Sequence, residues 1–281
     1  MQFAIIAAGK GSRLAYEGAT LPKPLVPLLG VSMVERLLSI YTECGADKIA
    51  IIVNQDNRSV FQRLQELAGK YNLDICVRNT PSSMHSFYEL SELLDSEKFC
   101  LSTVDTVFST ARFKAYIEEF RNSDNVDALM AVTSYIDDEK PLYVQTDNEM
   151  NITGYYDMQG DCRYVSAGIY CLTDKCLDVL KECIENGLSR MRAFQRQLVL
   201  NGMRVKAFDI GKVIDVDHVE DVAKAEILIS VHAWVWTCAN VQSDMGSVAK
   251  VIMVSSLYFP SVMLHPEEEC PLWNTSEFLL A

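Results

Sequence analysis

A cluster of glycines and cations follows the first apolar run of the sequence. The pentapeptide Gly-Lys-Gly-Ser-Arg occupies residues 9–13, directly after the strand-like run 3–7. Glycine has no Cβ, so the backbone N–H groups of such a loop can approach phosphate oxygens closely. Lys10 and Arg13 add two positive charges at the same place. The loop therefore predicts a binding site for the phosphates of a nucleotide.

Two other phosphate-binding loops do not fit these residues. A dinucleotide-binding loop requires a third glycine where Leu14 stands. A Walker A loop requires Gly-Lys followed by Ser or Thr, whereas Lys10 is followed by Gly11.

A third cation, Lys23, stands between Pro22 and Pro24. Proline restricts its own backbone and that of the residue before it, so we expect an extended, stiff segment that projects the Lys23 side chain. The alternative is that Lys10, Arg13 and Lys23 are solvated loop cations. Three cations and two glycines after one strand favour the phosphate-binding interpretation in an acidic chain.

Carboxylates follow two later strand-like segments. Asp105 ends the apolar run 99–104, and Asp215 and Asp217 alternate in the segment 213–217, where alternate strand residues point the same way. Mg²⁺ binds one or two carboxylates together with phosphate oxygens and water. Asp105 with Asp215 or Asp217 therefore predicts a Mg²⁺ site. Asp217 serves equally well as the N-cap of a helix expected at 218–230, in the pattern Asp217-x-x-Glu220.

The elements that must position these residues alternate between strands and helices through about residue 130. This order predicts an α/β fold with a mainly parallel sheet, right-handed crossovers and ligands beyond the carboxyl ends of the strands. The first long helix begins after Ser32, whose Ser32-x-x-Glu35 pattern is a capping box. The expected strands are 3–7, 48–53, 73–77, 99–104, 128–132, 143–146, 152–156, 164–172, 205–210 and 213–217, and further helices are expected near 60–71, 83–94, 113–120, 174–186 and 190–201.

Length, charge and cysteine content limit the class of protein. The 281 residues carry a formal net charge of −13, which disfavours nucleic acid as a partner. The nine cysteines form no CxxC pair, and most lie in apolar runs, where they are interpreted as small core residues. An odd number of scattered thiols is typical of a protein in a reducing compartment. No leader-like segment precedes the first strand, so we expect a cytoplasmic protein.

We expect two parts in the chain: a domain at residues 1–231 and a C-terminal extension of unassigned fold at 232–281. Within the extension, the apolar stretch 247–264 is interpreted as a packed tail, with a membrane segment as the alternative.

The chain resembles the nucleotidyltransferase superfamily, which includes sugar-1-phosphate nucleotidyltransferases, bacterial phosphocholine cytidylyltransferases and molybdenum-cofactor nucleotidyltransferases. The resemblance lies in Ala-Gly-Lys-Gly-Ser-Arg-Leu at 8–14, Pro-Lys-Pro at 22–24 and Leu-Leu-Gly at 28–30, and it extends to about residue 230. Asp105 and the segment 214–217 resemble the metal-binding positions of the family. The resemblance implies a three-layer, Rossmann-like nucleotide-diphospho-sugar transferase fold with helices on both faces of the sheet. It also implies nucleotide contacts at Ala7, Ala8, Gly9, Gly11 and Ser12.

Two further segments resemble parts of the family that contact the nucleotide base and the acceptor substrate. Residues 165–170 resemble the strand that lines the acceptor site of the family, with Ser166 replacing Asn, so the resemblance implies acceptor contacts at Ser166 and Gly168. Residues 79–86 lack the Gly-Thr-Ala pattern of many sugar enzymes and are more similar to the Asn-rich choline-phosphate type. Nucleotide contacts are implied at Asn79, Ser83 and His85. His85 is either a base or ribose contact or an exposed residue of the first helical turn.

These features predict a Mg²⁺-dependent nucleotidyltransferase. It transfers a nucleotidyl group from an NTP to a sugar 1-phosphate or a phosphocholine-like monoester, releasing pyrophosphate, with nucleotide-sugar biosynthesis as one setting. Lys23, Arg13 and Lys10 are the predicted catalytic cations. The alternatives are a glycosyltransferase of the related fold, with Asp215-x-Asp217 as its metal motif, and a non-catalytic nucleotide-binding regulatory domain. The base, the acceptor and the oligomeric state are left open.

Overall fold

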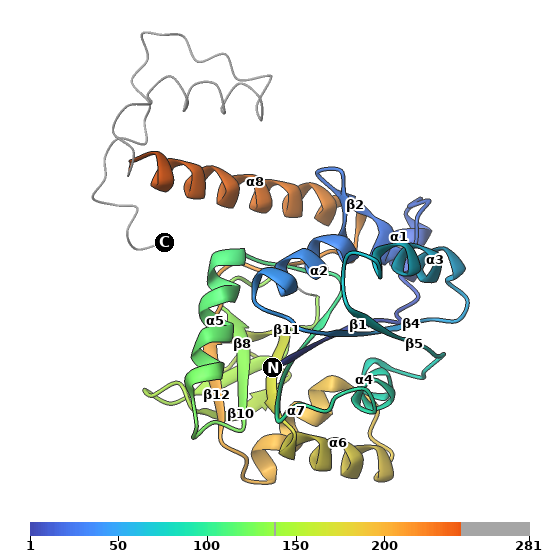
Figure 1. Cartoon of the computed structure of the whole chain (residues 1–281). Coiled ribbons are helices and arrows are strands. Elements are labelled where there is room, and N and C mark those ends of the chain that lie inside the picture. The colour runs from blue at the N-terminus through green and yellow to red at the C-terminus, as the bar shows by residue number, and fades with distance from the viewer. Residues whose placement is uncertain (138, 243–281) are drawn as a thin grey trace. The chain divides into compact units, whose positions relative to one another are not determined.

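A computed structural model describes residues 1–137 and 139–242, with side-chain surroundings up to residue 231. Residues Met1–Ile229 form one compact unit, whose elements Figure 1 labels. The C-terminal segment 247–264 lies outside the described residues. Among the residues described, no helix is both long and apolar enough to cross a membrane.

The centre of the fold is a parallel sheet in which β1 and β4 are fully buried and the edge strand β5 is half-buried. Strand β1 pairs in parallel with β4 on one side and β6 on the other, and β4 pairs with β5. Strands buried on both faces have no polar alternation, which explains the continuous apolar runs of the sequence. The four strands are β1 (Gln2–Ala7), β4 (Ile49–Val53), β5 (Leu73–Val77) and β6 (Lys98–Thr103).

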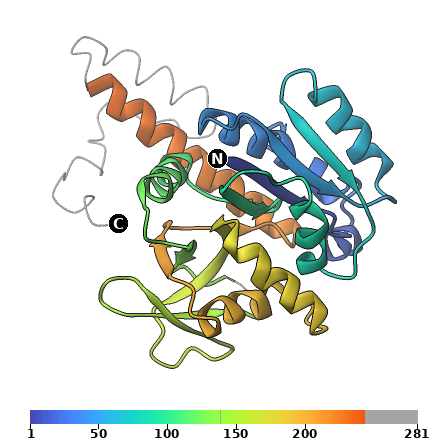
Figure 2. The same ribbon diagram turned by 60° about the horizontal axis from the view of Figure 1, so that its bottom comes forward.

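Alternate residues of β1 face two separate cores. Phe3 and Ile5 pack in one core, while Ala4 and Ile6 pack in the other. Helices α2 (Met33–Glu43), α3 (Arg58–Leu67) and α5 (Thr110–Asn122) cover the first core. Helices α4 (Ser83–Ser91), α6 (Lys175–Glu185) and α7 (Met191–Leu200) cover the second. Figure 1 shows α2 above the sheet and α6 and α7 below it, and Figure 2 brings the α6–α7 side forward.

The second half of the chain extends the sheet with antiparallel strands. Strand β11 pairs antiparallel with β6 and β9 on one edge and with β8 on the other, and β12 runs parallel to β8. The α/β prediction with a mainly parallel central sheet and helices on both faces is confirmed. These strands are β8 (Ala128–Thr133), β9 (Tyr143–Thr146), β10 (Ile152–Tyr156), β11 (Tyr164–Thr173) and β12 (Val205–Asp209).

Two small sheets lie beyond the carboxyl edge of the large one. Strands β2 (Pro27–Leu28) and β3 (Val31–Ser32) form a hairpin. Strands β7 (Thr106–Val107) and β13 (Ile214–Asp215) pair antiparallel, and a hydrogen bond from the N–H of Val216 to the carbonyl oxygen of Asp105 continues the pairing. This pairing joins two segments more than 100 residues apart in sequence.

Several predicted boundaries shift. The glycine loop leads into a short helix, α1 (Ser12–Tyr16), which the sequence did not indicate. Helix α4 ends at Ser91 rather than at Leu94. Helix α8 (Val219–Gln242) continues well past the expected end at residue 230. Ser32 is the N-cap of α2, because its hydroxyl oxygen accepts a hydrogen bond from the N–H of Glu35, which is one half of the predicted capping box. The Glu35 carboxylate instead pairs with Arg63.

Candidate active site at the carboxyl edge of the sheet

The glycine loop leaves β1 at its carboxyl end, and the fold constrains its two glycines differently. Gly11 has a φ of 58°, in the left-handed region, and a Cβ on it would lie 2.9 Å from the Cβ of Lys23. A Cβ on Gly9 would meet no atom within 4 Å and would project into open space. The fold therefore requires glycine at position 11, whereas nothing in the protein itself requires it at position 9.

Lys23 is held in a helical turn. The prediction of an extended backbone here is wrong, because Lys23–Leu25 form a 3-10 turn, labelled η1. Only Pro22 is extended, and its carbonyl oxygen accepts a hydrogen bond from the N–H of Leu25. Pro24 occupies the second position of the turn, where its missing N–H leaves no hydrogen bond unmade. The turn directs Lys23 against the glycine loop.

The ammonium group of Lys23 lies between two carboxylates. Its Nζ is 2.5 Å from Oδ2 of Asp105 and 2.5 Å from Oδ1 of Asp217. The Lys23 side chain is 9% exposed. Burial alone would lower the pKa of Lys23, but the two carboxylates outweigh it and raise the pKa above its ordinary value. Lys23 is therefore held in its charged form between the two acids.

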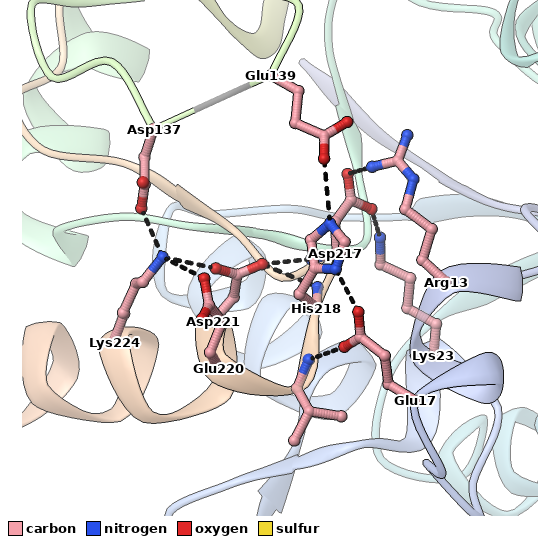
Figure 3. Close-up of polar contacts among 11 residues, drawn as sticks. Arg13, Glu17, Lys23, Asp137, Glu139, Asp217, His218, Glu220, Asp221 and Lys224 are labelled. Atoms are coloured by element: carbon pink, nitrogen blue, oxygen red, sulfur yellow. Dashed lines mark hydrogen bonds and ion pairs between the residues drawn. The ribbon is translucent and has the colours of Figure 1, made fainter.

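Asp217 also binds Arg13, as Figure 3 shows. The Arg13 Nη1 donates to Oδ2 of Asp217 at 2.6 Å, so each oxygen of this carboxylate has its own cation. Burial raises the pKa of Asp217, yet the hydrogen bond from Lys23 and the charges of Lys23 and Arg13 bring it below the usual range. Asp217 is thus ionised and is shared by the glycine loop and the 3-10 turn.

The helix-cap interpretation of Asp217 is not what the structure shows. The carboxylate that accepts from the backbone at the start of α8 belongs to Asp221, whose Oδ2 accepts from the N–H groups of Asp217 and His218. Glu17 also accepts from the N–H of Val219. With these donors satisfied by other side chains, the Asp217 carboxylate is left to face Lys23 and Arg13.

Asp215 lies beside this cluster but in a different orientation. The β7–β13 pairing places it opposite Thr106, whose hydroxyl donates to its Oδ1 at 2.8 Å. Desolvation by the surrounding protein and then the charge of Asp105 raise the pKa of Asp215 to about 7, although the residue itself is exposed to solvent at the cavity surface. A bound cation would reverse this shift, because it favours the ionised form.

The donor set at Asp105 and Asp217 fits a divalent cation. Their oxygens converge on one point, which the Lys23 ammonium occupies. Among the described residues, no three His, Cys, Asp or Glu side chains form a group that would hold a metal. Two carboxylates are enough for Mg²⁺ when substrate phosphates and water complete its ligands.

Two cavities adjoin this cluster. The glycine-loop cavity, of about 420 Å³, is lined by the loop, Lys23 and Asp105. The carboxylate cavity, of about 510 Å³, is lined by Asp215, Ser166 and a group of acidic side chains. Arg13 and Asp217 line both cavities. The two cavities therefore meet at the Arg13–Asp217 ion pair.

The structure brings most of the predicted nucleotide contacts together in the glycine-loop cavity. Its lining includes Ala7, Ala8, Gly9, Lys10, Gly11, Ser12, Arg13, Lys23 and Ser83. Asn79 and His85 do not line it. The Asn79 side chain instead accepts from the N–H of Gln55, and His85 Nδ1 is 2.9 Å from the hydroxyl of Ser82.

Sequence reasoning missed other side chains of this cavity, among them Asn54, Thr80 and Ser86. Asn54 directly follows β4, so its place at the carboxyl edge of the sheet could have identified it as a residue of the site from the sequence. Its amide donates to the carbonyl oxygen of Ala8 at 3.4 Å. Thr80 and Ser86 hydrogen-bond each other at 2.6 Å, a pairing that no local pattern indicates.

The two predicted acceptor residues differ in their placement. Ser166 lines the carboxylate cavity and donates to Oε1 of Gln195 at 2.8 Å. Gly168 does not line either cavity. Its φ of 70° suits glycine, and a Cβ there would lie 3.4 Å from the Thr106 hydroxyl. Gly168 thus leaves room for the threonine that holds Asp215.

Comparison with known proteins identifies the family. Residues 3–201 match the family described as MobA-like NTP transferase domain. The bifunctional protein GlmU of Synechococcus sp. (strain CC9902) is 27% identical over 174 residues, covering 60% of this chain and 38% of that protein. A 2-aminoethylphosphonate cytidylyltransferase of Lancefieldella rimae is 28% identical over 109 residues, covering 37% of this chain and 43% of that protein. The chain thus matches less than half the length of these relatives.

Solved structures share the fold. The inositol-1-phosphate CTP transferase from T. maritima superimposes with a TM-score of 0.71 at 23% identity, covering 82% of this chain and 95% of that one. A putative glucose-1-phosphate thymidylyltransferase from Bacillus anthracis gives a TM-score of 0.71 at 19% identity, covering 81% and 94%. With the family match extending over most of the folded unit, this chain belongs to the MobA-like NTP transferase domain family of nucleotidyltransferase enzymes.

Proposed function

We propose that this chain catalyses the Mg²⁺-dependent transfer of a nucleotidyl group from an NTP to a phosphate monoester. One observation carries the proposal: the glycine-loop cavity and the carboxylate cavity meet at Arg13 and Asp217, beside the buried Lys23. An NTP in the first cavity and an acceptor in the second would bring their phosphates together at this junction. Such juxtaposition is the main contribution a protein makes to phosphoryl-type transfer.

The relatives support the reaction class and leave a choice of substrates. One relative is named for a cytidylyltransferase acting on 2-aminoethylphosphonate, and another for a sugar-1-phosphate nucleotidylyltransferase. Both reactions join a nucleotide to a phosphate or phosphonate oxygen. We therefore propose a small phosphate ester, either a sugar 1-phosphate or a phosphocholine-like compound, as the acceptor.

The transfer needs no general base. An ionised acceptor phosphate already carries a nucleophilic oxygen, which attacks the α-phosphorus of the NTP. The new P–O bond forms as the α–β phosphoanhydride bond breaks, and the bond electrons leave with pyrophosphate. In our proposal Lys23 contacts the α-phosphate, where charge builds, while Lys10, Arg13 and the backbone of the glycine loop hold the β- and γ-phosphates.

Mg²⁺ would be held by Asp105 and Asp217, whose oxygens converge on one point. Asp215, hydrogen-bonded to Thr106, is the alternative second ligand. When bound, the ion supplies neutralisation of the phosphate charge. It would also take over the neutralisation of the two aspartates, leaving Lys23 available to a phosphate oxygen.

A matrix of substrates tests the proposal. The four NTPs are mixed in turn with glucose 1-phosphate, phosphocholine and related esters, with and without Mg²⁺, and pyrophosphate release is measured. We expect release that requires both an acceptor and Mg²⁺. Magnesium-dependent NTP binding with no product from any acceptor would instead indicate the regulatory alternative. Hydrolysis or transfer from a nucleotide sugar without pyrophosphate release would indicate the glycosyltransferase.

A further inference from the structure

The carboxylate cavity is more acidic than a site for a phosphate ester needs to be. Besides Asp217, six carboxylates line it: Glu17, Asp137, Glu139, Asp215, Glu220 and Asp221. Apart from Arg13 at the junction, the basic side chains of its lining are Lys224 and His218. A phosphate dianion entering this cavity would be repelled unless another part of the same molecule were attractive to the walls.

The cations of the cavity do not cancel this charge. Lys224 Nζ is 3.1 Å from Asp137, 3.3 Å from Glu220 and 3.1 Å from Asp221, so one ammonium serves three carboxylates (Figure 3).

His218 likewise lies between two carboxylates. Its Nδ1 is 2.5 Å from Glu17 and its Nε2 is 3.9 Å from Glu139. Even a protonated imidazole therefore faces two carboxylates, and the cavity keeps a negative excess on the side away from Arg13.

Away from Asp215 and Asp217, the acidic wall of this cavity is not arranged as a metal site. Among the residues whose positions are described, no three His, Cys, Asp or Glu side chains are grouped to bind a metal ion. The wall instead includes an aromatic ring, that of Tyr135. The ammonium of Lys212 lies 4.2 Å from the centroid of this ring, so the ring attracts a cation on one face, and a ligand ammonium group would contact its other face or its edge.

We propose that the acceptor is zwitterionic, with a phosphate or phosphonate at one end and a primary or quaternary ammonium at the other. The phosphate end would meet Arg13 at the junction of the two cavities, and the ammonium end would lie against Asp137, Glu139 and Tyr135. This inference rests on the proposed function, because it names the acceptor of that reaction. It separates ammonium-bearing acceptors from sugar phosphates, whose hydroxyl groups can donate hydrogen bonds to the carboxylates but carry no charge to offset theirs.

Matched acceptors isolate the effect of the positive charge. Phosphocholine is compared with the isostere in which a tert-butyl group replaces the trimethylammonium group. Phosphoethanolamine is compared with propyl phosphate, and glucose 1-phosphate is included. Each is assayed with the full-length chain, Mg²⁺ and the most active NTP. Because charge-assisted contacts contribute about ten- to hundredfold in affinity, we expect kcat/KM at least about tenfold higher for the ammonium member of a pair.

Charge-removing variants locate the effect. The double variant Asp137→Asn, Glu139→Gln should lose most of the preference for the ammonium acceptor, while kcat/KM for the neutral isostere stays within about threefold of wild type. Glu149→Gln is the matched control, since Glu149 is exposed and lines neither cavity. It should keep the full preference.

The outcomes separate this inference from the proposed function. Equal or higher kcat/KM for neutral isosteres, or for glucose 1-phosphate, overturns the zwitterionic acceptor and leaves the transfer reaction intact. Absence of pyrophosphate release with every acceptor overturns the proposed function. In that case the same pairs are compared by titration calorimetry in the presence of NTP and Mg²⁺. Equal affinity within each pair then overturns the inference, and tighter binding of the ammonium member supports it.

Discussion

Replacement of Lys23 by methionine tests the centre of the site with little change in side-chain volume. The ammonium is 2.5 Å from both Asp105 and Asp217, and the side chain is 9% exposed. Loss of one preorganised charge at a developing anion commonly costs about 100-fold or more in rate. We therefore expect kcat to fall by about 100-fold or more, with pyrophosphate release as the assay.

The same change has a moderate cost in stability. Breaking a buried ion pair costs about 3–5 kcal/mol. Here the side chains of Asp105 and Asp217 are 23% and 41% exposed and keep contact with water. We expect a loss of about 1–2 kcal/mol in the free energy of unfolding, because solvent screens the repulsion of the two carboxylates. Urea denaturation measures it, and a circular dichroism spectrum like that of wild type shows that the fold is retained.

A control and a refuting result complete the test. Lys114→Met removes an exposed ion pair with Glu43, 2.9 Å long, and should leave turnover unchanged. If folded Lys23→Met retains turnover within about threefold of wild type, Lys23 does not stabilise the reacting phosphate. The assignment of the glycine-loop cavity as the transfer site would then be wrong.

Three further predictions follow from the structure. Gly9→Ala should weaken NTP binding by about tenfold or more with little loss of stability, as titration calorimetry would measure. Gly11→Ala should lower the free energy of unfolding by about 1–3 kcal/mol, measured by urea denaturation, because Gly11 has a φ of 58° and lies close to the Lys23 Cβ. Asp105→Ala or EDTA should abolish most pyrophosphate release without unfolding, and activity of the variant at ordinary Mg²⁺ concentration would contradict the metal assignment. Asp127, whose pKa the hydrogen bonds from Arg204 lower to about 2, stabilises the fold in its ionised form. Asp127→Asn should therefore cost about 1–2 kcal/mol above pH 5, and its difference from wild type should shrink as pH falls from about 4 toward 2; a difference that does not change over this range would refute the ion-pair explanation.

Local features of the sequence were sufficient to predict the order of strands and helices and the place of the glycine loop. The apolar runs, the alternation of strands and helices and the capping box at Ser32 each depend on residues within a few positions of one another. The glycine loop was found in the same way, since a close approach of backbone to phosphate requires adjacent small residues. These signals predicted the α/β fold and placed the loop and Asp105 at the carboxyl edge of the sheet, where the structure has them.

Side-chain geometry needed the tertiary structure. Lys23 and Asp217 are 194 residues apart, so no local pattern could show that they form an ion pair. The alternation in 213–217 suggested that Asp215 and Asp217 share one orientation, but the strand ends at Asp215 and the chain turns there. Asp217 consequently faces Lys23 and Arg13, and Asp215 faces Thr106.

The two cavities also differ in how much of each could be predicted from the sequence. The sequence alone led to the prediction that phosphates bind near Gly9 and Lys23, because the residue types and spacing of that loop are typical of phosphate binding. It did not determine what faces the second cavity, whose acidic walls come from α1, the segment after β8 and the start of α8. Charges scattered along the chain act together only when folding brings them within a few ångströms of one another. That collective charge, and with it the proposed acceptor, was decided by tertiary structure alone.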